Sequence, residues 1–232
     1  MWSLILLREI NDPPLTLILF DVDGTLIDSQ AHILKSMEMA FSRHTLPLPN
    51  REDILTSVGL SLFEAFGQLC PDADGVERLA LVNSYKNSFS KLRQTIASSQ
   101  LYPGAMTCLN NLWAVDSFVL GIATGKSRRG LDHVLENSGL VGRFGTEQVA
   151  DDHPSKPNPA MGLQAMAETG ASRGAMIGDT SFDMEMGRAA GLKTIGVSWG
   201  YHGASAVGEN ADRVIDHFDQ LLPEIQNLWS DK

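Results

Sequence analysis

The chain has 232 residues, of which 43% are hydrophobic, and carries a formal net charge of −10 at pH 7. This length can bury a substantial core, in one domain or in one domain with an insertion. The acidic balance argues against a nucleic-acid partner, because such partners require a basic face. It does not exclude a small anionic ligand, which needs only a local positive site.

The two cysteines, Cys70 and Cys108, are far apart and lack the spacing of a metal site. We therefore expect free thiols and a cytoplasmic protein. The first residues contain an apolar patch that is too short for a membrane span and has no basic segment before it, unlike a signal peptide. Residues 1–13 are expected to form a loosely attached extension, with no membrane partner. The sequence leaves a monomer and a homodimer equally open.

The apolar run at 15–20 ends abruptly in the sequence DVDGT at 21–25. The run leaves neither face polar, which is typical of a central parallel strand covered by helices on both sides. Asp21 and Asp23 at its tip repel each other and lose solvation. A bound divalent cation together with an anionic substrate is the most economical explanation for such a pair.

Residues 29–100 show helical spacing of apolar residues and no convincing strand. We expect helices at 33–44, from about 53 with a break at Gly59, at 62–69 and at 76–98. This segment is predicted to be an all-helical insertion.

After residue 104 the predicted strands and helices alternate. Strands are expected at 118–123, 148–150, 175–177, 194–197 and 213–215, and helices at 105–114, 131–137, 159–168, 182–190 and 218–228. The alternation predicts an α/β fold with a doubly wound, mostly parallel, Rossmann-like sheet. The expected core domain comprises residues 1–28 and 101–232, and the helical domain comprises residues 29–100.

Four polar segments are each expected at a strand end. Besides Asp21 and Asp23, they carry the following residues: Gly24, Thr124, Gly125, Lys156, Asp179 and Asp183. Each has an ordinary alternative, such as helix capping by a threonine or solvation of a surface lysine. Because the carboxyl ends of parallel strands meet at one edge of a sheet, the four segments together predict one site.

Two other phosphate-binding motifs are excluded. The sequence Gly125-Lys126-Ser127 resembles the end of a P-loop, but that motif needs a glycine where Leu120 stands. A dinucleotide site would need glycines, not acids, after the first strand.

The four segments, in this order and spacing and with the helical insertion after the first, resemble those of the haloacid dehalogenase superfamily of aspartyl-phosphate hydrolases. They are similar to those of the phosphoglycolate phosphatase-like branch with an α-helical cap, and the resemblance covers about residues 15–228. The resemblance implies that Asp21 is the nucleophile and that Asp23 is the general acid and base. It also implies that Lys156 offsets the negative charge of the nucleophile and the phosphate.

The resemblance further implies that Gly24, Thr124, Gly125 and Lys156 hold the phosphate. It implies a Mg²⁺ ion bound by Asp21, the backbone carbonyl of Asp23 and Asp179. Asp183 would support this metal shell or Lys156.

The implied activity is Mg²⁺-dependent hydrolysis of a small phosphorylated metabolite through an aspartyl-phosphate. A phosphosugar mutase or a pyrophosphatase of the same fold, and a non-catalytic binding module, remain alternatives.

In the helical segment, hinges are expected near 28–29 and 100–104, and the turn at 57–60 is expected to reach the substrate. Arg51, Lys91 and Arg93 are candidates for contact with an anionic leaving group. His153 is expected to be a loop residue and not a catalyst.

Overall fold

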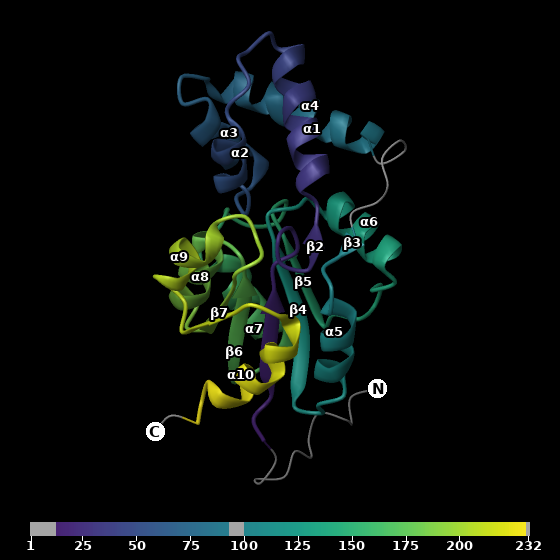
Figure 1. Ribbon diagram of the computed structural model, residues 1–232, viewed down its shortest axis with the longest axis vertical. Coiled ribbons are helices and arrows are strands. Elements are labelled where there is room, and N and C mark those ends of the chain that lie inside the picture. The colour runs from purple at the N-terminus through teal and green to yellow at the C-terminus, as the bar shows by residue number, and fades with distance from the viewer. Residues whose placement is uncertain (1–12, 93–99, 231–232) are drawn as a thin grey trace.

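A six-stranded sheet forms the centre of the computed structural model, which describes residues 13–92 and 100–230 (Figure 1). Its strand order is β5-β4-β1-β6-β7-β8, and every adjacent pair is parallel. The strands are β1 (Thr16–Phe20), β4 (Phe118–Thr124), β5 (Thr146–Val149), β6 (Arg173–Gly178), β7 (Lys193–Val197) and β8 (Arg213–Ile215). The expected α/β fold with a doubly wound, parallel sheet is confirmed.

Strand β1 lies in the middle of this sheet and is buried along its whole length. Its alternate residues serve opposite faces, as the two-residue period of a strand requires. Ile18 and Phe20 belong to one hydrophobic cluster, whereas Leu17 and Leu19 belong to another. This explains why the sequence of the strand shows no polar face.

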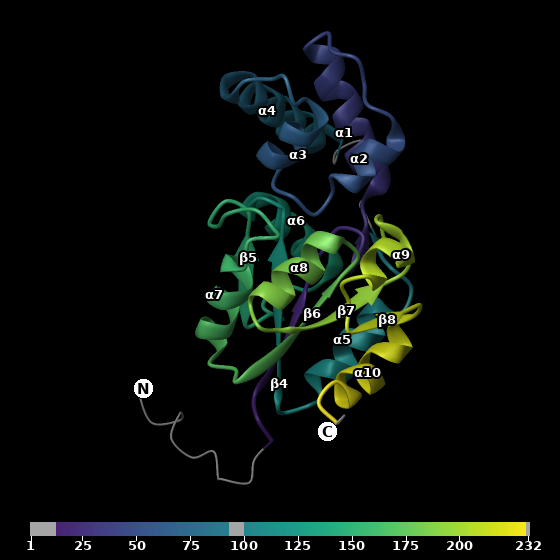
Figure 2. The same cartoon turned by 90° about the vertical axis from the view of Figure 1, so that its left-hand side faces the viewer.

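Helices cover both faces of the sheet (Figure 2). The cluster of Ile18 and Phe20 includes residues of α5 (Ala105–Trp113), α6 (Arg128–Ser138) and α10 (Leu221–Asn227). The cluster of Leu17 and Leu19 includes residues of α7 (Ala160–Thr169) and α8 (Ser181–Ala189). The polar residues that follow these strands therefore lie at the edge of a sheet that is packed by helices on both faces.

The segment between β1 and β4 forms a separate group of helices above the carboxyl edge of the sheet (Figures 1 and 2). These helices are α1 (Gln30–Arg43), α2 (Arg51–Thr56), α3 (Leu62–Leu69) and α4 (Gly75–Leu92). They share a hydrophobic cluster of their own, which includes Met37, Phe41 and Phe66. The part of the expected last helix at 93–98 lies outside the described residues, as do residues 1–12 of the expected extension.

Two short strands connect this helical group to the sheet. Strand β2 (Ile27–Asp28) pairs antiparallel with β3 (Gln100–Leu101), so that Asp28 lies opposite Gln100. Both lie at the positions where hinges are expected. The pairing itself was not predicted, because strands of two residues carry no detectable period.

Two further features complete the described fold. A 3₁₀ turn at Phe218–Gln220 precedes α10, and an unpredicted short helix α9 (Gly203–Gly208) follows β7. Both cysteines are free thiols, Cys108 buried and Cys70 half-buried. Within residues 13–92 and 100–230, none of the helices combines the length and the apolar character that a membrane span requires.

Candidate active site

Three buried carboxylates meet at the carboxyl edge of the sheet. Asp21 follows β1, Asp179 follows the neighbouring strand β6, and Asp183 lies in the first turn of α8. All three residues are at most 1% exposed. One oxygen from each lies within 4.8 Å of the others. The sheet order therefore brings together acids that are far apart in the sequence.

Lys156 is the cation among these acids. Its ammonium donates to Asp21 Oδ1 and to Asp183 Oδ1, at 2.6 Å each, and its side chain is fully buried. The expectation that Lys156 lies at a strand end is wrong, because β5 ends at Val149. A loop between β5 and α7 instead carries the lysine to the carboxylates.

Burial governs the ionisation of this group. Desolvation raises the pKa of Asp21 to about 7, although Lys156 opposes the rise. Desolvation and the neighbouring charge of Asp21 also raise the pKa of Asp179 well above its usual value. Burial alone would lower the pKa of Lys156, but the charges of Asp183 and Asp21 outweigh it and raise that pKa. The lysine therefore stays charged.

The same group fits a divalent cation. Three carboxylates and one ammonium give a charge of −2 when all are ionised, which one such ion would balance. Asp21 Oδ2 is buried and has no hydrogen-bond partner among the described residues. A buried acceptor in this state is costly unless a ligand satisfies it. Oxygen donors of this kind suit Mg²⁺.

Asp183 is already engaged by protein groups. Its Oδ1 accepts from Lys156, and its Oδ2 accepts from the amide and the hydroxyl of Thr180 at 3.1 and 2.7 Å. Asp179 Oδ1 accepts from Thr25 and its Oδ2 accepts from the Tyr201 amide, at 2.9 and 2.8 Å. Both oxygens of Asp183 therefore have protein partners, as expected of a residue that positions Lys156. The contact of Asp179 with Tyr201 was not predicted.

Gly24 has a positive φ of 84°, which favours glycine, and a Cβ there would collide with the Asp179 carboxylate. Its amide donates to the Ile27 carbonyl at 2.9 Å. That amide is therefore occupied within the loop, and phosphate binding by Gly24 stays a prediction.

Thr124 ends β4 at the same edge and is buried. It does not cap the following helix, because Ser127 takes that place and accepts from the Gly130 amide at 3.2 Å. Gly125, next in the chain, would place a Cβ only 2.5 Å from the Leu60 carbonyl oxygen. A glycine is therefore required where the turn at 57–60 approaches.

Asp23 is only partly buried and has two partners that sequence reasoning missed. Its Oδ2 pairs with the Lys126 ammonium at 2.7 Å, and its Oδ1 accepts from the Ser29 hydroxyl. Lys126 lies two residues after Thr124, so its position in a polar segment at a strand end could have marked it as a candidate site residue. Its partner could not be identified without the sheet order.

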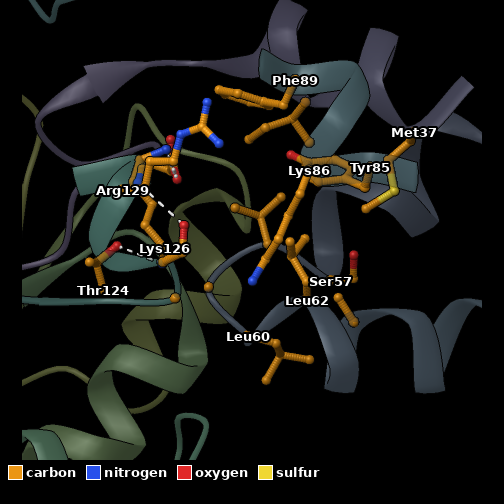
Figure 3. Close-up of a pocket in the computed structure, with 18 of the residues that line it drawn as sticks. Met37, Ser57, Leu60, Leu62, Tyr85, Lys86, Phe89, Thr124, Lys126 and Arg129 are labelled. Carbon is orange, nitrogen blue, oxygen red and sulfur yellow. Dashed lines mark hydrogen bonds and ion pairs between the residues drawn. The ribbon is translucent and has the colours of Figure 1, made fainter. Parts of the chain in front are cut away.

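A cavity of about 150 Å³ lies between this edge and the helical group (Figure 3). Asp21, Asp23, Thr124 and Gly125 line it from below, and the turn at 57–60 lines it from above. The turn therefore reaches the place where the sequence analysis expects the substrate.

The charged residues expected near the leaving group are not those found there. The described cations of the cavity lining are Lys86, Lys126 and Arg129. Arg51 instead donates to Gln30 at 2.6 Å, Lys91 lies outside the lining, and Arg93 lies outside the described residues.

His153 lies in the loop after β5. Its Nε2 is 2.6 Å from Gln148 Oε1, a contact that holds it beside β5.

Chemically, the carboxylates of Asp21 and Asp23 and the hydroxyl of Thr124 line one cavity, and the Lys156 ammonium is bonded to Asp21. Asp21 can act as a nucleophile because Oδ2 is unpaired among the described residues, while Oδ1 is held by Lys156. Asp23 is partly buried and lines the same cavity, so its carboxylate can reach a leaving group there. Such a set suits transfer of a charged phosphoryl group, in which positioning and charge balance dominate.

Comparisons with known proteins agree with this chemistry. The family model described as "Haloacid dehalogenase-like hydrolase" matches residues 18–197. A protein named "Probable phosphatase IndB" from Dickeya dadantii is 35% identical over 214 residues, which are 89% of this chain and 91% of that protein. A pyrophosphatase from Bacillus velezensis is 30% identical, and the alignment covers 91% of this chain and 97% of that protein.

Two proteins of lower sequence identity are also hydrolases by name. A phosphoglycolate phosphatase from Yersinia pseudotuberculosis is 27% identical, covering 89% of this chain and 91% of its own. The solved structure of a haloacid dehalogenase-like family hydrolase from Streptococcus pneumoniae superposes with a TM-score of 0.78 at 24% identity. The superposition covers 91% of this chain and 99% of that chain, and it supports the assignment of the fold.

Proposed function

Because the chain belongs to the haloacid dehalogenase-like hydrolase family and has phosphatase relatives, we propose that it is a Mg²⁺-dependent phosphomonoesterase acting on a small phosphorylated metabolite. The observation that carries the proposal is the Asp21 carboxylate. It is buried, held on one oxygen by Lys156 and unpaired on the other among the described residues, at the base of a cavity.

In the proposed reaction, Asp21 attacks phosphorus and the bond from phosphorus to the leaving oxygen breaks. Asp23 gives its proton to that leaving oxygen and later takes a proton from the water that cleaves the aspartyl-phosphate. Lys156 balances the charge of Asp21 and the phosphoryl group throughout. Thr124 and Gly125 hold the phosphoryl oxygens at the end of β4.

The residues that would hold Mg²⁺ are Asp21, Asp179 and the backbone carbonyl of Asp23, with Asp183 positioning Lys156. When bound, the cation offsets the negative charge that accumulates on the phosphoryl oxygens. The charge of −2 on the three carboxylates and Lys156, and the closeness of one oxygen from each acid, support this assignment.

The helical group at 29–100 would act as a cap over a core formed by residues 1–28 and 101–232. Its turn at 57–60 lines the cavity and lies against Gly125. A cap in this place excludes water while the acyl-phosphate forms. The two free cysteines are compatible with a reducing cytoplasm as the place of action.

The test is phosphate release by the purified chain from 4-nitrophenyl phosphate with Mg²⁺. Release should stop with EDTA and in the Asp21→Asn variant, and acid quenching of the wild type should trap an acid-stable acyl-phosphate. An inactive wild type, or an Asp21→Asn variant as active as the wild type, would refute the proposal.

Pyrophosphatase activity is the second candidate, favoured by the 30% identity to a pyrophosphatase. The same nucleophile and acid can cleave a phosphoanhydride. Comparing kcat/KM for pyrophosphate and for phosphate esters decides between the two activities.

A further inference from the structure

The cavity above Asp21 has an apolar wall on the cap side. The wall is formed by side chains from α1, α3, α4 and the turn at 57–60: Ile33, Met37, Val58, Leu62, Tyr85 and Phe89. The polar groups of the phosphoryl end, Asp21, Asp23 and Thr124, lie on the opposite side. The two halves of a bound substrate would therefore meet very different surroundings.

Two cations of the cavity lining, Lys86 and Arg129, form no ion pair with Asp21 or Asp23 among the described contacts. Lys86 extends from α4 into the space between the cap and the sheet edge, and Arg129 rises from α6 toward Phe89 (Figure 3). Lys86 lies 3.8 Å from Asp151, a long and exposed ion pair, and Arg129 donates to the Ser90 hydroxyl at 3.0 Å. By contrast, Lys126 is held close to Asp23. The first two cations therefore remain able to bind a further anion.

The wall bears on which leaving groups fit. A second phosphate or a glycolate would leave the apolar side chains of the cap without a partner. The hydroxyl groups of a sugar would lose water against Met37, Leu62 and Phe89 and find few replacements, which is unfavourable. An apolar ring, in contrast, would bury its surface against the same wall.

The cavity volume limits the size of the ring. An engineered apolar cavity of about 150 Å³ holds one benzene molecule, and the cavity here has a volume of about 150 Å³. A single ring is therefore an upper limit for the apolar part of the leaving group, because the phosphoryl group takes part of the same space.

Building on the proposed phosphatase activity, we infer that the substrates are phosphate monoesters whose leaving group contains one apolar ring and a second anionic group. The ring packs on the wall formed by Met37, Leu62 and Phe89. The anionic group, a carboxylate or a second phosphate, binds Lys86 and Arg129.

The experiment measures kcat/KM of the full chain with Mg²⁺ for five compounds: phenyl phosphate, 4-carboxyphenyl phosphate, 1,4-phenylene bisphosphate, 2-phosphoglycolate and pyrophosphate. We expect the three aromatic esters to exceed the last two by about tenfold or more, the effect of burying part of one ring. The carboxylate and bisphosphate arms identify which anion the two cations prefer.

Lys86→Met keeps the aliphatic stem of the side chain and removes its charge. It should lower kcat/KM for 4-carboxyphenyl phosphate or for the bisphosphate by about tenfold, as expected for one charged hydrogen bond. The loss for phenyl phosphate should be clearly smaller, and comparing the two losses cancels the intrinsic reactivities of the substrates. Lys91→Met, on the same helix but outside the cavity, is the matched control and should change neither.

Leu62→Ala tests the wall. It should lower kcat/KM for phenyl phosphate by about threefold to tenfold, and by clearly more than it lowers kcat/KM for 2-phosphoglycolate. Leu79→Ala is the control, because Leu79 is exposed and lies outside the cavity.

The possible failures are distinct. If 2-phosphoglycolate or pyrophosphate is cleaved with a higher kcat/KM than every aromatic ester, the inference is overturned while the proposed phosphatase activity stands. Equal effects of Lys86→Met on charged and uncharged esters overturn the anion site. If the wild type cleaves no phosphate compound at all, both the proposed function and the inference fail.

Discussion

Replacing Lys156 by methionine should strongly destabilise the metal-free protein. The lysine side chain is fully buried, and its ammonium is 2.6 Å from both Asp21 Oδ1 and Asp183 Oδ1. Methionine has a similar length but no charge, so two buried carboxylates would lose their cation. Breaking a buried ion pair from one side costs about 3–5 kcal/mol, a large part of the ~5–15 kcal/mol that stabilises a typical protein.

For a chain of this size, about 1 kcal/mol of stability corresponds to roughly 2–4 °C in Tm. The Lys156→Met variant should therefore melt roughly 6–20 °C below the wild type in EDTA at pH 8, measured by calorimetry or dye binding. Adding Asp183→Asn should recover part of the loss, because one of the stranded charges is removed. Lys193→Met is the control, since Lys193 lies in a half-exposed pair 3.6 Å from Asp212 and should change Tm very little.

The destabilisation should also depend on pH. Burial raises the pKa of Asp21 to about 7 in the folded protein, above its unfolded value of 3.8. The folded protein holds the proton of Asp21 more tightly than the unfolded chain does. The contribution of this group to the free energy of unfolding is therefore lost as the pH rises from about 4 through 7. The Tm difference caused by Lys156→Met should therefore shrink between pH 8 and pH 5.5. A Tm within about 2 °C of the wild type at pH 8, or a larger loss at pH 5.5, would refute the charge argument.

Three further predictions follow from the same site. The rise in Tm on adding saturating Mg²⁺ should be larger at pH 8 than at pH 6, because protons compete with the cation for Asp21 and Asp179, whose pKa values are raised; an equal rise at both pH values would contradict a metal held by these carboxylates. Gly125→Ala should raise KM for any substrate about tenfold or more, because the new Cβ lies 2.5 Å from the Leu60 carbonyl oxygen and displaces the turn; steady-state kinetics with an unchanged Mg²⁺ affinity would show the effect, and an unchanged KM would count against it. Thr124→Val should weaken inhibition by inorganic phosphate by about tenfold, as expected for one hydrogen bond to a charged group, and unaltered inhibition would remove Thr124 from the phosphate site.

The sequence predicted the parts of this protein that depend on local pattern. The apolar run at 15–20 became the central strand, and Asp21, Thr124 and Asp179 follow or end strands as expected. Strand ends could be read because apolar residues stop abruptly where polar ones begin. Their convergence followed from a general property of parallel sheets.

Contacts between distant segments could not be read in the same way. The Lys126–Asp23 pair and the Tyr201 amide on Asp179 depend on which loops the sheet order brings together. Lys156 reaches the acids from a loop several residues beyond β5, and loops have no period that fixes their path. The short helix α9 is similarly invisible, because its six residues contain too few apolar positions to show a helical stripe.

The pairing of β2 with β3 places the two ends of residues 29–99 side by side, with Asp28 opposite Gln100. In topological terms, the whole helical group is the loop of one β-hairpin. The entropy cost of closing such a loop rises slowly, by about 0.6 kcal/mol for each doubling of its length. Loops of other sizes and shapes could therefore be exchanged at this ribbon with little effect on the sheet. The helical group, which we propose selects the leaving group, could thus diverge while the residues at the carboxyl edge of the sheet stay constant.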